Sequence, residues 1–120
     1  MILFYNLDNE TGKSLKLICV KNKIKIKNVT KSQYRETLGA LAGLSDAGGI
    51  IDAPSAQTDF SDEMLVFCNF DNRLLDTFLL EIKKNRLKRI ALKAVLTEQN
   101  ISWDSCTLHA ELVKEHEAMR

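Results

Sequence analysis

Several features are missing from this sequence of 120 residues, and each absence excludes a class of protein. The three cysteines, Cys19, Cys68 and Cys106, are widely spaced and contain no C-x-x-C pair, which excludes a full disulfide framework and argues against a structural zinc site. The apolar run from Met1 to Tyr5 is too short for a signal peptide or a membrane span. The net charge of +1 gives no global reason to expect a nucleic-acid or membrane partner. We therefore expect a cytoplasmic protein without a cofactor or a metal.

The composition that remains is that of an ordinary globular domain. Hydrophobic residues make up 45% of the chain and charged residues 28%, so extensive disorder is not expected. At this length about two thirds of the unfolded surface can be buried, which is enough for a real core. The sequence predicts a single domain over residues 1–120.

The longest apolar run, residues 64–70, organises the predicted fold. It has no polar face, so it reads as a strand buried on both sides, which is typical of a mostly parallel sheet between two layers of helices. Further strands are predicted at 2–5, at 24–27 and at 90–96, where Lys93 interrupts the apolar run. Lysines alternate with the isoleucines of residues 24–27 and mark that strand as a sheet edge.

Helical spacing of apolar residues predicts a helix or helical turn after each strand. We expect Thr11 or Ser14 to cap the first helix, the capping-box sequence Thr30-x-x-Gln33 to begin the second, and Asp71 or Asn72 to cap the third. Asn85 is expected to end the third helix in a left-handed conformation. A long loop is predicted at 45–62, and no internal repeat is visible.

This order of elements predicts an α/β fold with a four-stranded, mostly parallel sheet, strand order 2-1-3-4, and helices on both faces. In such a sheet, ligands bind beyond the carboxyl ends of the strands at the point where the order reverses, here between strands one and three. The candidate ligand-binding residues expected around that edge, together with a lysine inside the fourth strand, are Asn6, Asp8, Cys68, Asn69, Asp71, Lys93, Thr97 and Asn100.

The remaining chemical motifs are incomplete. Gly12-Lys13-Ser14 resembles the end of a phosphate-binding loop, but Leu7 stands where its first glycine is required, so a flexible turn is the simpler interpretation. His109 and His116 lie about 10 Å apart along one helix, too far for one metal. We identify no catalytic residue and no metal ligand set.

Cys68 and Lys93 each allow two interpretations. A thiol near a helix start can become nucleophilic, yet Cys68 lies in an apolar run with no neighbouring histidine and is more simply a core residue. A buried lysine can be catalytic, whereas on an edge strand Lys93 is more simply a charge that prevents aggregation. The alternative of a thiol-dependent enzyme or redox protein would use Cys68, assisted by Asn69 and Lys93.

Two basic clusters leave a second alternative. Residues 13–31 contain seven lysines and no acid, and residues 83–93 contain four lysines and two arginines. RNA binding through these clusters is the second alternative, but the stacking aromatics or glycine-rich signature that usually accompany it are missing. We therefore do not expect a nucleic-acid partner.

Three stretches and a closing segment form a recognisable pattern over most of the chain. The stretches are Leu38–Gly43, Glu63–Phe70 and Ala91-Leu92-Lys93-Ala94-Val95-Leu96-Thr97-x-x-Asn100-x-x-Trp103, and the closing segment is Lys114-Glu115-His116. On these residues the chain resembles a small bacterial family whose domain has no known function. The resemblance implies no activity. It does imply that Lys93, Thr97, Asn100 and Trp103 act together, as a strand-to-helix corner in which Thr97 or Asn100 caps and Trp103 packs.

From these observations we expect a non-enzymatic ligand-binding or protein-interaction module. Its partner is expected to be another protein or a second copy of the chain, contacted through the Gly39–Gly43 segment or the lysine-bearing edge.

Overall fold

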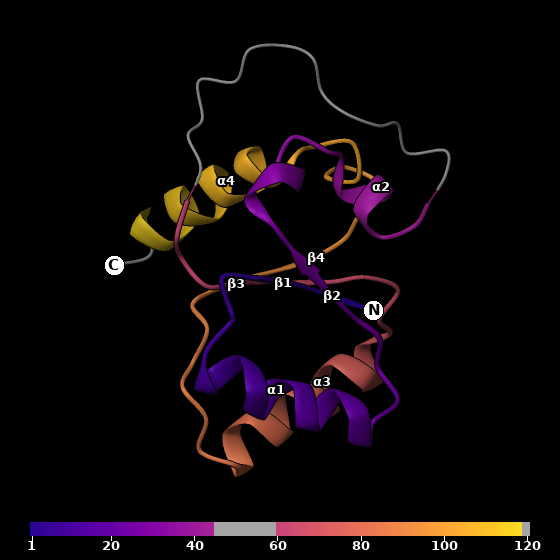
Figure 1. Ribbon diagram of the computed structural model, residues 1–120, viewed down its shortest axis with the longest axis vertical. Coiled ribbons are helices and arrows are strands. Elements are labelled where there is room, and N and C mark those ends of the chain that lie inside the picture. Colours follow the sequence, from indigo (N-terminus) through magenta and orange to yellow (C-terminus); the bar gives the residue numbers. More distant parts are fainter. Residues whose placement is uncertain (45–59, 119–120) are drawn as a thin grey trace.

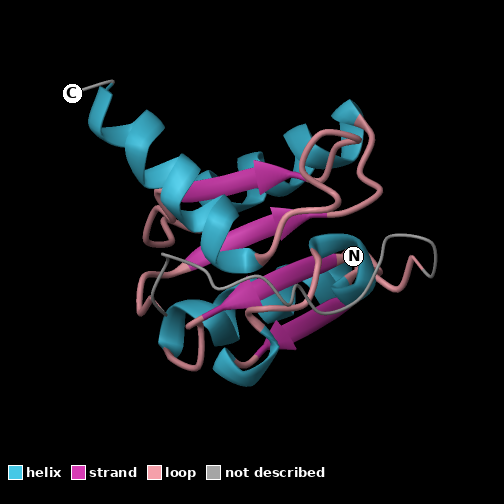
Figure 2. Cartoon of the chain, turned by 90° about the horizontal axis from the view of Figure 1, so that it is seen from above, coloured by secondary structure: helices cyan, strands magenta, loops and turns pink. Residues whose placement is uncertain are grey.

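The computed structural model describes residues 1–44 and 60–118, and it contains one four-stranded sheet between two layers of helices (Figures 1 and 2). The elements in chain order are β1 (Ile2–Tyr5), α1 (Glu10–Lys21), β2 (Ile26–Val29), a 3-10 turn (Lys31–Gln33), α2 (Leu38–Leu41), β3 (Met64–Phe67), α3 (Asn72–Lys84), β4 (Leu92–Val95) and α4 (Ser105–Ala118). Within the described residues no helix is long and apolar enough to cross a membrane.

The sheet has the strand order β2-β1-β3-β4, which confirms the predicted order. β1 pairs with β2 in parallel and β3 with β4 in parallel, but the central pair of β1 and β3 is antiparallel. The sheet is therefore mixed, although mostly parallel as expected. Helices α1 and α3 cover one face and α2 and α4 the other, as Figure 1 shows.

Two hydrophobic clusters, one on each face, hold these layers together. Alternate residues of β3 divide between them: Leu65 and Phe67 face α1 and α3, while Met64 and Val66 face α2 and α4. All four are at most 2% exposed, so the apolar run has no polar face because both of its faces are covered. Burying each such side chain contributes about 1.5–3 kcal/mol.

Several element ends differ from the predictions. Asn9, and not Thr11 or Ser14, caps α1 by accepting a hydrogen bond from the N–H of Gly12. Asp71 caps α3 as expected, but the left-handed residue after that helix is Arg86, because Asn85 is still its C-cap. Most of the predicted loop, residues 45–59, lies outside the described residues. Phe60, at its end, is a buried core residue.

The chain contains an internal repeat, so the expectation of none is wrong. Identical residues recur 63 positions apart in β1–α1 and β3–α3. The pairs are Met1 and Met64, Phe4 and Phe67, Asn6 and Asn69, Asp8 and Asp71, Asn9 and Asn72, Leu17 and Leu80, Lys21 and Lys84, Asn22 and Asn85, and Lys25 and Lys88. Each copy is a strand, helix, strand and helix, and we call residues 1–44 unit 1 and residues 60–118 unit 2.

Backbone geometry recurs at the same spacing. Asn6 and Asn69 have φ angles of 57° and 59°, in the left-handed region. Asn22 and Asn85 each end a helix and donate a side-chain N–H to the carbonyl four residues earlier, at 2.9 and 2.7 Å. Because these details match as well as the residue types, the two units share one local design, which sequence periodicity within single elements does not show.

Candidate functional site

The antiparallel pairing of β1 and β3 divides the predicted site between two opposite edges of the sheet. Tyr5 lies opposite Met64, so the carboxyl end of β1 meets the amino end of β3. Asn6 and Asp8 therefore lie beyond one end of the strands. We call this end of the sheet the lysine edge, which is distinct from the edge strands β2 and β4. Cys68, Asn69, Asp71, Thr97 and Asn100 follow β3 and β4 at the other end, called the cysteine edge. The expectation that both groups surround one switch point is wrong, because it required β1 and β3 to be parallel.

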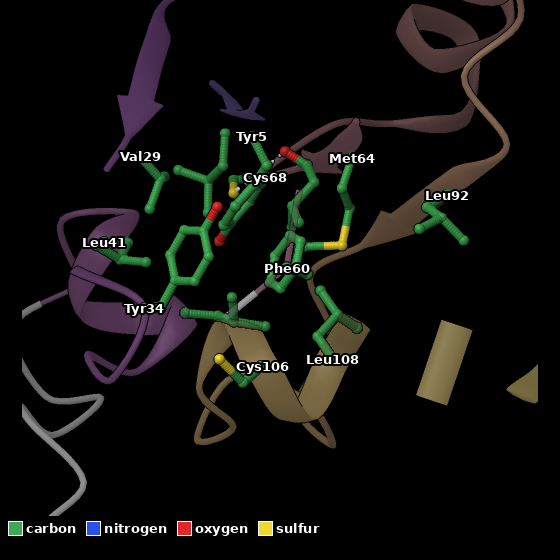
Figure 3. Packing of buried hydrophobic residues seen from close by; sticks show 13 residues of the cluster. Tyr5, Val29, Tyr34, Leu41, Phe60, Met64, Cys68, Leu92, Cys106 and Leu108 are labelled. Atoms are coloured by element: carbon green, nitrogen blue, oxygen red, sulfur yellow. Dashed lines mark hydrogen bonds between the residues drawn. The ribbon is translucent and has the colours of Figure 1, made fainter. Parts of the chain in front are cut away.

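At the lysine edge, Asn6 is held by a hydrogen-bond network. Its side-chain N–H groups donate to the carbonyls of Phe60 and Asp62 and to the Tyr34 hydroxyl, at 2.9–3.2 Å. The rings of Tyr34 and Phe60 stack with centroids 4.5 Å apart, and both lie beside Tyr5 (Figure 3). Asn6 thus fixes the chain that leads into β3, a structural role for a predicted ligand-binding residue.

The aromatic stack continues to His109 of α4. Its ring is parallel to that of Phe60 at a centroid distance of 4.0 Å, and its Nε2 lies 2.8 Å from Asp62 Oδ2. Its side chain is only 16% exposed. No signal in the sequence pairs residues 60 and 109, since neither lies in a motif.

Glu63 joins three segments at the same edge. Its carboxylate accepts hydrogen bonds from Asn9 Nδ2 and forms an ion pair with Lys88, both at 2.9 Å. Partial burial tends to raise the pKa of Glu63, but the hydrogen bonds from Lys88 and Asn9 and the Lys88 charge lower it overall. The network ties β3 to the start of α1 and to the residues before β4.

A pocket of about 480 Å³ opens beyond the carboxyl ends of the parallel strands β1 and β2. Among the described residues, the lining includes three lysines, Lys13 and Lys16 from α1 and Lys31 from the 3-10 turn, and one acid, Asp8. The other residues that line it are Phe4, Asn6, Leu7, Asn9, Gly12, Asn28, Val29 and Thr30. We call it the lysine pocket.

Gly12 has a structural reason to be glycine. It lies in the first turn of α1, and a Cβ there would overlap the carbonyl oxygen of Leu7. The glycine therefore permits close approach of the helix to the turn after β1, and the flexible-turn interpretation is corrected to a buried helical position.

The matching positions in unit 2 carry larger, apolar residues. At the positions 63 residues after Leu7, Gly12 and Lys16 stand Phe70, Leu75 and Leu79, which all pack against the cluster under α1 and α3. Asp76 stands where unit 1 has Lys13. The two copies have diverged so that unit 1 has a small, basic lining where unit 2 has a bulky, apolar one.

At the cysteine edge, Cys68 has the geometry of a core residue. It is 3% exposed, and its Sγ donates to the carbonyl of Val66 at 3.8 Å. Burial raises the pKa of the thiol to about 11, despite the opposing N-terminal charge. A pocket of about 600 Å³ borders Cys68, Asn69 and Thr97, but its two charged residues, Lys25 and Glu98, have opposite signs.

Thr97 and Asn100 form the strand-to-helix corner inferred from the sequence. The Thr97 N–H donates to Asn100 Oδ1 at 2.8 Å, and the Asn100 N–H donates to Thr97 Oγ1 at 3.2 Å. The Asn100 side chain also donates to the carbonyl of Val95. Trp103 packs against the cluster under α2 and α4. These polar groups satisfy one another and hold a turn.

Lys93 lies on the edge strand β4, away from both groups. Its Nζ donates to the carbonyl of Ile90 at 2.6 Å. Burial, and then the charge of Arg89, lower its pKa. The edge position agrees with a role against strand pairing, and the lysine does not join Thr97 and Asn100.

Unit 1 thus has a basic pocket at a place where unit 2 has larger apolar side chains, and comparison with known families distinguishes the same two parts. Residues 63–119 match the model of DUF3783, a domain of unknown function. The DUF3783 match confirms the expected resemblance for unit 2, while Leu38–Gly43 lies outside it. No curated protein and no solved structure gave a significant match to the chain. The DUF3783 segment begins just before β3, so its boundary coincides with that of the repeat.

Proposed function

We propose that the chain is a non-enzymatic binding module whose lysine pocket takes a small, phosphate-bearing ligand. The observation that supports this most directly is that three lysines and one acid are among the described residues that line the pocket, although Lys13 also pairs with Glu10 at 3.5 Å. The pocket volume of about 480 Å³ is within the usual range for small-molecule sites, which is about 300–1,000 Å³.

Internal comparison supports the proposal. Unit 2 has Phe70, Leu75 and Leu79 at the positions of Leu7, Gly12 and Lys16, and these larger apolar side chains pack against the cluster under α1 and α3. Unit 1 leaves the same place open, with Gly12 and Lys16 at the corresponding positions. Replacing large apolar residues by glycine and lysine reduces apolar burial. Such a loss is expected where the space binds a ligand.

Three alternatives have weaker support. The thiol-dependent enzyme needs a reactive Cys68, and this thiol is buried with its pKa raised to about 11. Self-association through the Gly39–Gly43 segment competes with contacts inside the chain, because the Gly39 N–H donates to the carbonyl of Ile101 at 2.9 Å. RNA binding remains an outcome of the experiment below.

The test is calorimetric titration of the full chain with inorganic phosphate, with adenosine monophosphate and with a short single-stranded RNA. Lys13→Gln/Lys16→Gln is compared with Lys83→Gln/Lys84→Gln, which removes the same charge from exposed positions of α3. Each charge-assisted hydrogen bond contributes roughly 1.5–3 kcal/mol, so loss of both pocket lysines is expected to weaken binding about a hundredfold or more. The control pair is expected to change it less than about threefold.

Two results would contradict the proposal. Undetectable binding of both phosphate compounds at low salt excludes a phosphate site. Binding of RNA alone, weakened equally by both double variants, assigns the lysines to a diffuse nucleic-acid surface, because that interaction depends on total charge.

A further inference from the structure

A two-fold axis relates unit 1 to unit 2. Two independent observations place it, namely the sequence repeat and the register of the sheet. The repeat equates Leu3 with Val66, since they are 63 positions apart. The sheet pairs Leu3 with Val66 directly, and its neighbouring pair Ile2 and Phe67 maps onto Phe4 and Leu65 under the same equivalence. An antiparallel pair in which equivalent residues face each other is the arrangement of an isologous dimer interface.

The helical layer gives a second crossing point for this axis. Thr37 caps α2 by accepting from the Ala40 N–H, and Asp104 accepts from the Thr107 N–H at the start of α4. The two residues are equivalent at a spacing of 67, because unit 2 has four more residues between its first helix and the threonine that follows its second strand. They also form an isolated antiparallel bridge with each other. Equivalent residues therefore meet in both layers.

We propose that β1 and β3 carry an isologous recognition surface, and that the partner it fits is a second copy of the same βαβα unit. In this chain the two copies are fused, so the fold is an intramolecular pair of DUF3783-type units, with unit 1 a diverged copy outside the DUF3783 segment. One unit alone would have a two-stranded sheet with an uncovered inner strand, which is marginal in water.

The side chains at the interface favour the pairing of unlike units. Tyr5 Oη and Ser105 Oγ are 2.7 Å apart across the interface. Their equivalents are Cys68 and Leu38, which have no such bond. Pairing of unit 1 with unit 2 is therefore preferred, while the apolar strand surface still allows unit 2 to pair with itself.

The experiment inserts a specific protease site at residues 45–59 of the full chain and cleaves the folded protein. Native mass spectrometry is expected to show the two pieces as a one-to-one complex with unchanged far-UV circular dichroism. After mixing with an excess of isotopically labelled unit 2 piece released from the same protein, a self-pair of unit 2 is expected beside the unlike pair. An ordinary domain cut in two gives only the unlike pair.

Val66→Ala provides the matched variant. In the unlike pair it removes methyl groups once, opposite Leu3, whereas in the self-pair the altered residue meets itself and the loss occurs twice. Each loss is expected to cost roughly tenfold in association, so the self-pair should weaken about a hundredfold. The proposal is overturned if no self-pair forms where the unlike pair is stable, or if Val66→Ala weakens both pairs equally.

Discussion

Asparagines in the left-handed conformation occur at equivalent positions of the two units, but their side chains make different hydrogen bonds. Asn6 and Asn69 both follow a buried strand with φ near +58°, where asparagine is tolerated better than most residues. Asn6 also holds Tyr34, Phe60 and Asp62 through its side chain. Sequence reasoning identified both residues as polar groups after strands and assigned them to a ligand, because the partners of Asn6 are remote in the chain.

The pair offers a matched comparison. Asn69→Ala is expected to lower the free energy of unfolding by up to about 1 kcal/mol, because asparagine adopts the left-handed conformation more readily than alanine. Asn6→Ala should cost about 2–4 kcal/mol, because it also removes three hydrogen bonds. Urea denaturation of both variants gives the two values. Equal losses would show that the Asn6 network contributes no net stability.

At the scale of elements, most of the topology could be predicted from the sequence. Buried runs and lysine alternation predicted the strand order and an edge at β2, because burial patterns report on neighbours. The direction of β3 could not be predicted, because it depends on the edge at which the chain enters that strand. Leu44 lies beside Met1 at the cysteine edge, whereas Phe60 lies beside Asn6 at the lysine edge. No pattern in the intervening sequence indicates that β3 begins at the lysine edge. The predicted site therefore combined residues from both ends of the sheet, which lie apart in the structure.

The junction of β3 with α1 and the chain before β4 is expected to weaken in acid. The pKa of Glu63 is lowered in the folded protein, so its contribution is fully present above the unfolded value of about 4.3 and is lost as the pH falls through the folded value. Glu63→Gln should therefore destabilise the protein at pH 7 and have less effect near pH 3. Thermal unfolding across this range measures the difference.

Glu115→Gln, an exposed substitution on α4, is the control for charge removal alone. A constant difference between Glu63→Gln and the parent protein from pH 7 to pH 3 would contradict the assigned role of the carboxylate.

The whole molecule should unfold as one cooperative body, because each hydrophobic cluster contains residues of both units. Gly12→Ala in unit 1 forces a Cβ against the Leu7 carbonyl and is expected to cost roughly 3 kcal/mol. Trp103, the one tryptophan of the sequence, lies in unit 2. Its fluorescence midpoint in urea should fall together with the circular-dichroism midpoint. A tryptophan transition that stays in place would show that unit 2 is stable independently.

The pairing of Leu3 with Val66 has an evolutionary consequence. On the axis of a homodimer a residue faces its own copy, so a single mutation changes both sides at once. The two facing side chains are therefore always of the same type and size. Fusion of two units gives each side its own codon, and a larger residue can then face a smaller one, as leucine faces valine here. The same freedom permits a tyrosine on one side to find a serine that its counterpart lacks. Because the two units are covalently linked, residues at the centre of the interface need not be identical, and the two copies can acquire different linings at equivalent places.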